Sequence, residues 1–260
     1  MQKIFILILN LIFLSNPAFC ALFEGGVEKT GLGKSSVILD AQTNTPIANV
    51  KITLPQKNFT TYTDSNGAFN LNAKINSPTI LAVEKEGYRP YSITIDKDAA
   101  SKPLIVSIEK STLEDIIVTS GWYHLGDNSF SQNSANCNEF HEKAHGSYYT
   151  KTFNLATQSL ASKYILIIGS IIGIDSLMAQ KMGQNKVKVA YASPPEIYLN
   201  GIKIANVELN GDSQRFELPK NIIRKGLENE LTIKTGRNMS QTSHIDYNDI
   251  EFMNLSIITE

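Results

Sequence analysis

The chain has 260 residues, of which 42% are hydrophobic and 19% are charged. This hydrophobic share is typical of folded domains and excludes extensive disorder, which requires low hydrophobicity and high charge. Lys and Arg number 24 and Asp and Glu number 25, so the net charge of −1 excludes sequence-independent binding to nucleic acid. Two cysteines are too few for a disulfide-rich scaffold.

Residues 1–21 have the pattern of a secretory signal peptide. Lys3 precedes an apolar run from Ile4 to Leu14, and the small residues Ala18 and Cys20 fit the positions before a cleavage site. The run has 11 residues, whereas a membrane span needs about 20, so we disfavour a membrane anchor. We expect the mature chain to be secreted, periplasmic or at the cell surface, with no transmembrane span and with Cys137 as its one cysteine.

Residues 34–112 alternate apolar and polar side chains with a period of two. Val50, Ile52 and Leu54 form one such run, and similar runs follow at 91–95 and 104–108. Turn signals such as Asp64-Ser65-Asn66-Gly67 separate the runs. Because alternation of this kind places one face of each strand in a core, the pattern predicts a β-sandwich without a long helix.

The same residues resemble the carboxypeptidase regulatory-like domain. Three motifs carry the resemblance in the order of that family: Thr45-Pro46-Ile47-Ala48-Asn49-Val50, Thr63-Asp64-Ser65-Asn66-Gly67-Ala68-Phe69 and Glu86-Gly87-Tyr88. The resemblance implies a transthyretin-like sandwich of seven strands with an accessory, non-catalytic role. In the second motif we expect Asp64 and Asn66 to cap the turn and Gly67 to supply a positive φ.

Residues 113–120 are interpreted as a linker that carries an edge strand into a second domain, residues 121–260. Asn200-Gly201 between two apolar runs is a strong hairpin signal, and one short helix is expected from Asp175 to Gly183. Strands are predicted at 148–155, 164–174, 187–190, 196–199, 202–209, 215–218, 230–234 and 250–258. About eight strands favour a jelly-roll β-sandwich, so the predicted fold class is all-β throughout.

This second domain resembles the galactose-binding-like jelly rolls of polysaccharide-degrading enzymes. The resemblance spans residues 148–258 and rests on the hairpin Glu196–Ile204, the segment Phe216–Leu231 and the acidic strand Asp246–Phe252. It implies a sugar-binding domain, although it supports the fold more firmly than any ligand, since many such domains only pack against their neighbours.

Carbohydrate binding is the first candidate activity. Sugars place their apolar faces on aromatic rings, and their hydroxyls need fixed amide or charged partners. The residues that we expect to supply these groups are Trp122, Tyr123, Tyr148, Tyr198, Asn200 and Arg237. The alternative for each aromatic residue is a place in the core of the sandwich.

Two metal sites are also considered. His141-Glu142-Lys143-Ala144-His145 is an H-E-x-x-H sequence, which on a helix lets two histidines bind zinc while the glutamate activates water. The alternative is a solvated helical turn, because Lys143 is unusual in that motif and no third ligand follows. Asp246, Asp249 and Glu251 could supply oxygen ligands to a structural calcium ion. The alternative is that these three acidic side chains are simply solvated.

These observations favour an exported, non-enzymatic protein for carbohydrate binding or cell-envelope adhesion, with no catalytic residues assigned. Its expected partner is a glycan or envelope polysaccharide. One alternative is a zinc-dependent hydrolase that uses His141, Glu142 and His145. Another is a structural module that binds an envelope protein through the edge strands of the first domain.

Overall fold

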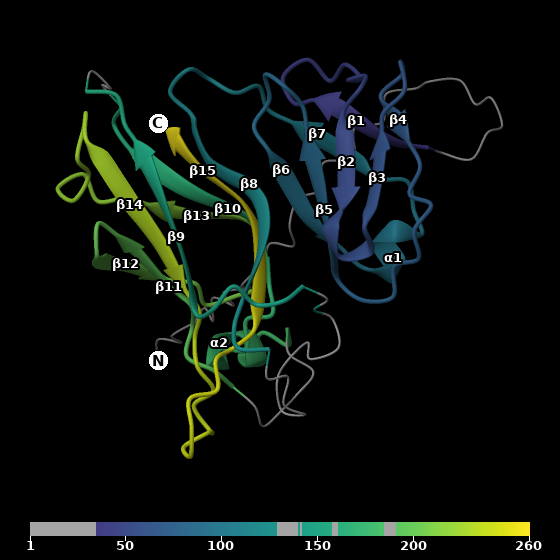
Figure 1. Ribbon diagram of the computed structural model, residues 1–260. Helices are drawn as coiled ribbons and strands as arrows, with labels where there is room; N and C mark the ends of the chain where they lie inside the picture. Colours follow the sequence, from purple (N-terminus) through teal and green to yellow (C-terminus); the bar gives the residue numbers. More distant parts are fainter. Residues whose placement is uncertain (1–34, 129–139, 141, 158–160, 185–190) are drawn as a thin grey trace, which may run out of the picture. The chain divides into compact units, whose positions relative to one another are not determined.

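The chain folds into two β-sandwiches, which residues 109–115 connect (Figure 1). The computed structural model describes residues 35–128, 140, 142–157, 161–184 and 191–260. Residues 34–260 make up one unit, which holds both sandwiches. The predicted signal peptide, Cys137, His141 and the strand expected at 187–190 lie outside the described residues.

The first sandwich has seven strands in two sheets, as the family resemblance implies. One sheet has the order β4-β1-β7 and the other the order β3-β2-β5-β6, with β1 and β7 parallel. The strands are β1 (Ser36–Asp40), β2 (Lys51–Leu54), β3 (Phe59–Tyr62), β4 (Ala68–Phe69), β5 (Thr79–Glu84), β6 (Tyr91–Ile95) and β7 (Ile105–Ile108). The alternating residues Val50, Ile52 and Leu54 are fully buried in its core, as their period predicts.

The turn before β4 has the predicted chemistry. Asp64 Oδ1 accepts hydrogen bonds from the backbone N–H groups of Asn66 at 2.8 Å and Ala68 at 2.9 Å. Gly67 takes a φ of +69°, and Phe69 returns to the core with 3% of its surface exposed. The side-chain cap of this turn therefore comes from Asp64.

The second sandwich has eight antiparallel strands in two four-stranded sheets, ordered β13-β10-β15-β8 and β12-β11-β14-β9. The strands are β8 (Ile116–Leu125), β9 (Tyr148–Asn154), β10 (Tyr164–Ile172), β11 (Glu196–Leu199), β12 (Ile202–Asn206), β13 (Gly211–Glu217), β14 (Glu228–Lys234) and β15 (Ile250–Thr259). Residues 116–120 of the predicted linker belong to β8, which is an edge strand that pairs with β15. The all-β prediction is confirmed for both sandwiches.

Short local signals in the second sandwich also form as expected. Asn200 and Gly201 connect β11 to β12 with φ angles of +51° and +79°, as a two-residue hairpin loop requires. Helix α2 (Leu177–Lys181) begins after Ser176, whose side chain accepts a hydrogen bond from the Ala179 N–H. The other helical segments are η1 (Pro55–Lys57) and α1 (Lys97–Ala100). No helix of the described residues is long and apolar enough to cross a membrane.

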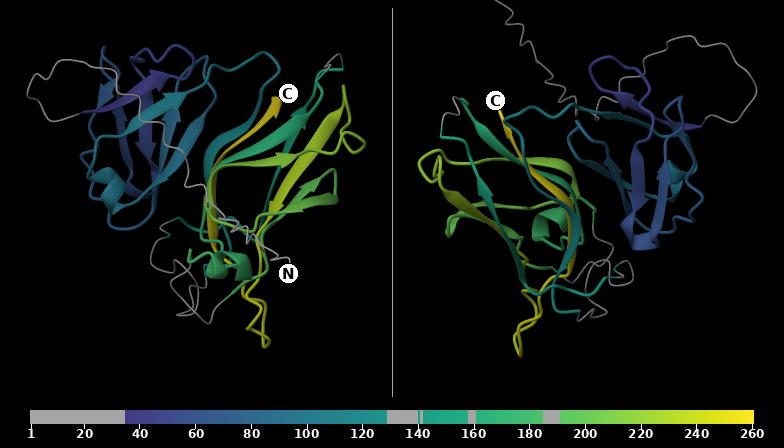
Figure 2. Two further views of the ribbon diagram at one scale, coloured as in Figure 1. Left: turned by 180° about the vertical axis from the view of Figure 1, so that it is seen from behind. Right: turned by 45° about the horizontal axis from the view of Figure 1, so that its top comes forward.

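Each sandwich has its own apolar core, and a third apolar cluster lies where the sandwiches meet. Figure 2 shows the two sheets of the second sandwich as separate layers, with α2 at one end. Strand β6 contacts β10, β13 and β15. The junction cluster consists of Ile80, Ala82, Phe140, Ile172 and Met253, with Trp122 packed against it.

Hydrogen bonds fix the same junction. The Asp212 carboxylate on β13 accepts bonds from the backbone N–H and the hydroxyl of Thr94 on β6, at 2.9–3.0 Å. Because β6 is covered on both sides, Ser92 is fully buried although the alternation at 91–95 predicts an exposed polar residue there. An apolar–polar period of two predicts a strand with one buried face. It gives no sign that the other face of β6 is also buried.

Gly67, in the turn that Asp64 caps, and Gly201, in the β11–β12 hairpin, differ in how much room surrounds them. A Cβ on Gly67 would lie 2.8 Å from Ile38 O and 2.9 Å from Pro46 Cβ, whereas a Cβ on Gly201 would meet nothing within 4 Å. Both residues have positive φ, so both Gly→Ala changes carry a backbone cost of about 1–2 kcal/mol.

We therefore expect Gly67→Ala to lower the free energy of unfolding by about 3 kcal/mol, and Gly201→Ala by only about half as much. Urea denaturation of the two variants measures the difference. Equal losses would show that crowding against Ile38 and Pro46 is relieved without cost.

Candidate functional site

The outward side of the sheet β12-β11-β14-β9, called here the outer face, carries aromatic and charged side chains. Ile197, Leu199, Leu231 and Ile233 point into the core, so the residues between them point outward. The strand register places Glu196 beside Lys234, and Lys234 beside Tyr148. A second row has Tyr198, Thr232 and Thr150 side by side.

Hydrogen bonds order part of the outer face. The Tyr198 hydroxyl donates to Glu196 Oε2 at 2.6 Å, and Lys203 Nζ donates to Glu196 Oε1 at 2.6 Å. The Lys203 bond, followed by the Tyr198 bond, lowers the pKa of Glu196, so this carboxylate stays charged. Tyr148 is 62% exposed, which leaves its ring open for contact with a ligand.

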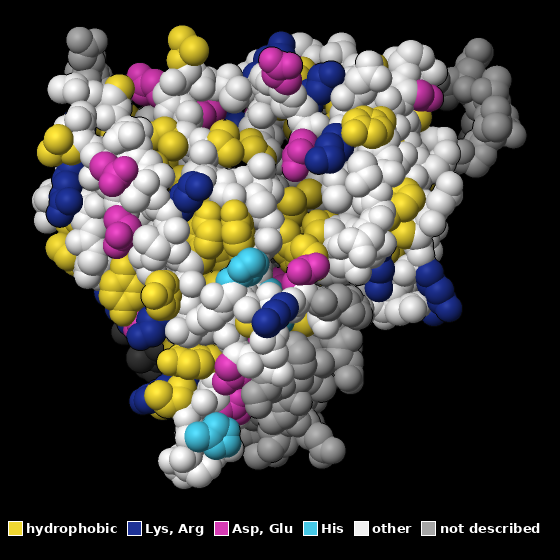
Figure 3. Space-filling model, viewed as in Figure 1, with side chains coloured by type: hydrophobic (Ala, Val, Ile, Leu, Met, Phe, Trp, Pro, Cys, Tyr) yellow, Lys and Arg dark blue, Asp and Glu magenta, His cyan; other side chains and the backbone are white. Residues whose placement is uncertain are grey.

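The outer face continues into a pocket of about 410 Å³ at one end of β11 and β14. Glu196, Lys234, Arg237 and Tyr247 are among its lining residues. Over β9 and β14, Figure 3 shows hydrophobic side chains scattered among charged ones. An aromatic surface of this mixed kind suits a ligand with both apolar faces and hydroxyl groups.

Three of the predicted sugar-binding residues thus belong to this region: Tyr148 and Tyr198 on the outer face and Arg237 in the pocket. The other three support the fold. Trp122 packs against the junction cluster, and the ring centroid of Tyr123 lies 4.2 Å from that of Tyr149 and 5.5 Å from that of Phe252. The Asn200 side-chain amide donates to Ile222 O at 2.8 Å, which ties the hairpin to a neighbouring loop.

The H-E-x-x-H segment has no helix in residues 142–147, so the expected helical turn is wrong there. The backbone instead follows the end of β8: His145 N–H donates to His124 O, and Gly126 N–H donates to Gly146 O, both at 2.9 Å. His145 is exposed, and its ring meets the edge of Tyr123 with the centroids 6.0 Å apart.

The sequence analysis missed a buried polar cluster around His124, which stands in β8 with none of its surface exposed. Its Nε2 lies 2.8 Å from Asp249 Oδ1, and its Nδ1 lies 2.6 Å from the backbone carbonyl oxygen of Glu142. Both neighbours are acceptors, so the ring satisfies both contacts by donating from each nitrogen, as an imidazolium does. The signal available in sequence was only an isolated histidine in an apolar strand.

Glu251 extends this cluster to the first sandwich. Gln56 Nε2 donates to Glu251 Oε2 at 2.8 Å, while Gln56 Oε1 accepts from the Ile80 N–H at 2.8 Å. Burial raises the pKa of Glu251 to about 7, against the lowering effects of the Gln56 bond and the His124 charge. For His124, burial lowers the pKa, but Asp249 and Glu251 outweigh it, so the net shift is upward.

Two of the three carboxylates proposed for calcium, Asp249 and Glu251, lie beside His124, and the third, Asp246, bonds elsewhere. Asp249 faces His124, Glu251 faces Gln56, and Asp246 Oδ2 accepts from Asn238 Nδ2 at 3.1 Å. Within the described ranges, no three His, Cys, Asp or Glu side chains converge to hold a metal ion. The calcium and zinc sites both stay predictions from the sequence.

Residues 35–118 match the family described as the CarboxypepD_reg-like domain. This range covers the whole first sandwich and the start of β8, so the resemblance of the first domain is confirmed. No curated protein sequence matches the chain.

Two solved structures have a weak likeness to the chain. A β-D-glucuronidase from Dictyoglomus thermophilum is 13% identical with a TM-score of 0.29, over 58% of this chain and 29% of that one. A Bacteroides uniformis protein described as a candidate carbohydrate-binding protein is 11% identical with a TM-score of 0.20, over 86% of this chain and 97% of that one. This chain thus spans only 29% of the glucuronidase chain.

The buried cluster predicts that the protein loses stability as pH rises. A carboxyl whose pKa is raised from 4.5 in the unfolded chain to about 7 in the fold stabilises the fold fully below pH 4.5, and this stabilisation is lost as pH rises toward 7. The raised pKa of His124 acts in the same direction at higher pH. The loss attributable to Glu251 is on the order of 3 kcal/mol.

Glu251→Gln keeps the side-chain shape and the acceptor for Gln56 but removes the charge, so the fall in unfolding free energy with pH becomes shallower. Urea denaturation at several pH values measures it, with the exposed Glu217→Gln as the control. A variant profile parallel to that of the wild type would contradict the assignment.

Proposed function

We propose that the protein is an exported, non-enzymatic carbohydrate-binding or cell-envelope adhesion protein, and that the outer face with its pocket binds the glycan. The observation that carries the proposal is the exposed Tyr148 ring in register with Lys234 and Glu196, one row from Tyr198. Sugar rings stack their apolar faces on such rings, while hydroxyls bond to neighbouring charged and polar groups. Arg237 in the pocket would supply further donors.

Other features support this proposal. Export is supported by the signal-peptide pattern of residues 1–21, and a non-enzymatic role by the CarboxypepD_reg-like match at residues 35–118, a domain type with accessory functions. In this arrangement the first sandwich is the spacer and the second sandwich the binder. The resemblance of residues 148–258 to galactose-binding-like jelly rolls supports that division.

A protein-interaction module is the second candidate, because the first sandwich exposes apolar side chains on edge strands. Tyr62 on β3 is 60% exposed and Ile105 on β7 is 72% exposed. Edge strands with such side chains can pair with a strand of another protein.

We expect Tyr148→Ala and Tyr198→Ala each to weaken glycan binding about tenfold, which corresponds to about 1.4 kcal/mol, because each removes a ring surface. Polysaccharide pull-down and glycan-array binding of the whole chain measure the effect. Tyr62→Ala is the matched control, since Tyr62 is a comparably exposed tyrosine on an edge strand of the other sandwich.

Binding to no glycan at all, or equal binding by Tyr148→Ala, Tyr198→Ala and wild type, would refute the proposal. If the Tyr62→Ala variant alone lost a protein partner, the interaction-module alternative would gain support instead.

A further inference from the structure

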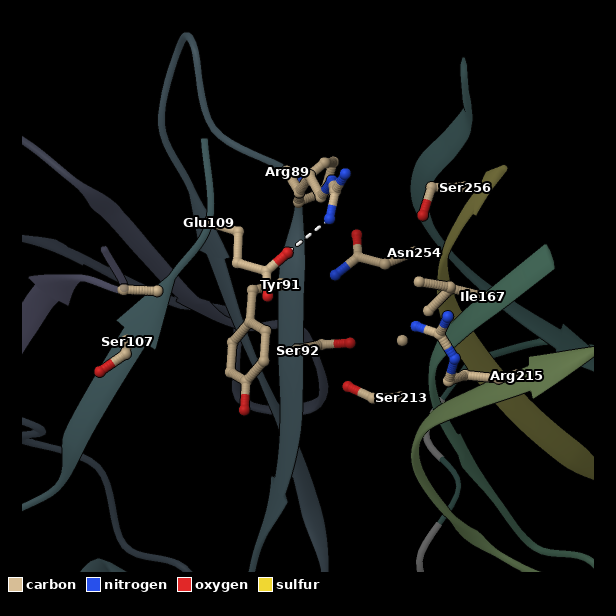
Figure 4. A pocket seen from close by; sticks show the side chains of 13 residues that line it. Arg89, Tyr91, Ser92, Ser107, Glu109, Ile167, Ser213, Arg215, Asn254 and Ser256 are labelled. Atoms are coloured by element: carbon tan, nitrogen blue, oxygen red, sulfur yellow. Dashed lines mark hydrogen bonds and ion pairs between the residues drawn. The ribbon is translucent and has the colours of Figure 1, made fainter. Parts of the chain in front are cut away.

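A cleft of about 370 Å³ lies between the two sandwiches, away from the outer face. Its volume falls within the range of small-molecule sites, about 300–1,000 Å³. Figure 4 shows Arg89, Tyr91 and Ser92 on one wall and Asn254, Ser256 and Arg215 on the other. The first wall belongs to the first sandwich, and the second wall consists of residues from β10, β13 and β15.

Two buried polar side chains in this cleft have unused hydrogen-bonding capacity. Ser92 is fully buried and Asn254 is 2% exposed. Neither the Ser92 hydroxyl nor the two polar atoms of the Asn254 amide have a hydrogen-bond partner among the described residues. In Figure 4 both groups point into the space between the walls. Leaving such groups unpaired costs free energy, so a polar ligand that pairs them recovers part of that cost on binding.

The fold presents Asn254 through an irregularity in β15. The pairing of β15 with β8 shifts on both sides of Leu255, and Asn254 has a φ of +59°. Met253 packs in the junction cluster and Asn254 lines the cleft, so two consecutive residues face the first sandwich, while Leu255 returns to the core. Irregularities of this kind redirect a side chain and are frequent beside binding sites.

Gly169 on β10 lets the Ser92 and Asn254 side chains lie close to the strand backbone. Its neighbours Ile168 and Ser170 pair with Leu255 and Met253, so Gly169 lies across from Asn254. A Cβ on Gly169 would stand 2.6 Å from the Ser92 hydroxyl and 2.7 Å from Asn254 Cβ. Any side chain here would therefore press on the two unpaired groups.

The charges at the rim indicate a neutral ligand. Arg89 forms ion pairs with Asp115 at 2.7 Å and with Glu109, and Arg215 forms one with Glu260. Because these carboxylates offset both guanidinium groups, the cleft offers no excess positive charge to an anion. It offers instead an amide with a donor and an acceptor, several hydroxyl groups and the Tyr91 ring.

We propose that this cleft binds a neutral saccharide of one or two sugar units, whose hydroxyls pair with the Asn254 amide and the Ser92 hydroxyl. A sugar presents adjacent groups that each donate and accept, which matches what these two side chains lack. The site is separate from the outer face and does not require glycan binding there.

Two variants remove the pairing groups with little effect on the fold. Ser92→Ala deletes a hydroxyl that has no partner in the described structure, so the free energy of unfolding stays the same or rises. Asn254→Gly deletes the amide and retains the positive φ. Matched controls are Thr53→Val, which deletes another buried hydroxyl unpaired among the described residues, and Asn58→Gly, at another asparagine with positive φ.

Isothermal titration calorimetry and saturation-transfer NMR on the whole chain test the proposal, with glucose, galactose, mannose, xylose, lactose and cellobiose as probes. We expect at least one probe to bind with one-to-one stoichiometry. Ser92→Ala and Asn254→Gly should each weaken that binding tenfold or more, while Thr53→Val and Asn58→Gly bind as the wild type does.

Two results would overturn the proposal: no probe binds the wild type, or binding survives both Ser92→Ala and Asn254→Gly. The cleft would then hold water only. Glycan binding at the outer face has its own test, because Tyr148→Ala and Tyr198→Ala reduce polysaccharide pull-down and leave the cleft intact.

Discussion

Burial of β6 against β10, β13 and β15 is the constraint on which the rest of the structure depends. In a single β-sandwich each sheet buries one face against the other sheet. Here the sheet that contains β6 and the sheet that contains β10, β13 and β15 also pack against each other, so both faces of each are covered in part. Apolar residues such as Ile80 and Met253 fill part of this junction. The remaining contacts are polar and have to be paired, since unpaired buried groups cost free energy.

Some buried polar side chains at the junction are hydrogen-bonded and others are not. This difference links the fold to the proposed function. Thr94 and Asp212 satisfy one another, and Gln56 satisfies one oxygen of Glu251. Ser92 and Asn254 are left without partners in the described structure, beside Gly169, where no larger side chain fits. The paired contacts connect the two sandwiches, whereas the unpaired Ser92 and Asn254 line the cleft between them.

The outer face follows a different principle. There the strand period alone decides which side chains face outward, and the register of three strands brings Tyr148, Lys234 and Glu196 into one row. Its polar groups are exposed or half-buried, so pairing them adds little to stability. A surface of this kind can exchange residues without loss of the fold, and its ligand preference rests on a few side chains.

The sequence by itself determined the features that depend on neighbours along the chain. These include the alternation around Ile52, the Asp64–Gly67 turn, the Asn200-Gly201 hairpin and a short helix within residues 175–183, because backbone geometry and capping act within a few residues. It also named Tyr148, Tyr198 and Arg237, which the tertiary structure places on the outer face or in the adjoining pocket. Tertiary structure alone decided the roles of Trp122, Tyr123 and Asn200, the absence of a helix at residues 142–147, and the burial of Ser92, His124 and Glu251. Those outcomes depend on which strands meet across the two sandwiches, and partners more than 100 residues apart, such as Gln56 and Glu251, leave no local pattern in a single sequence.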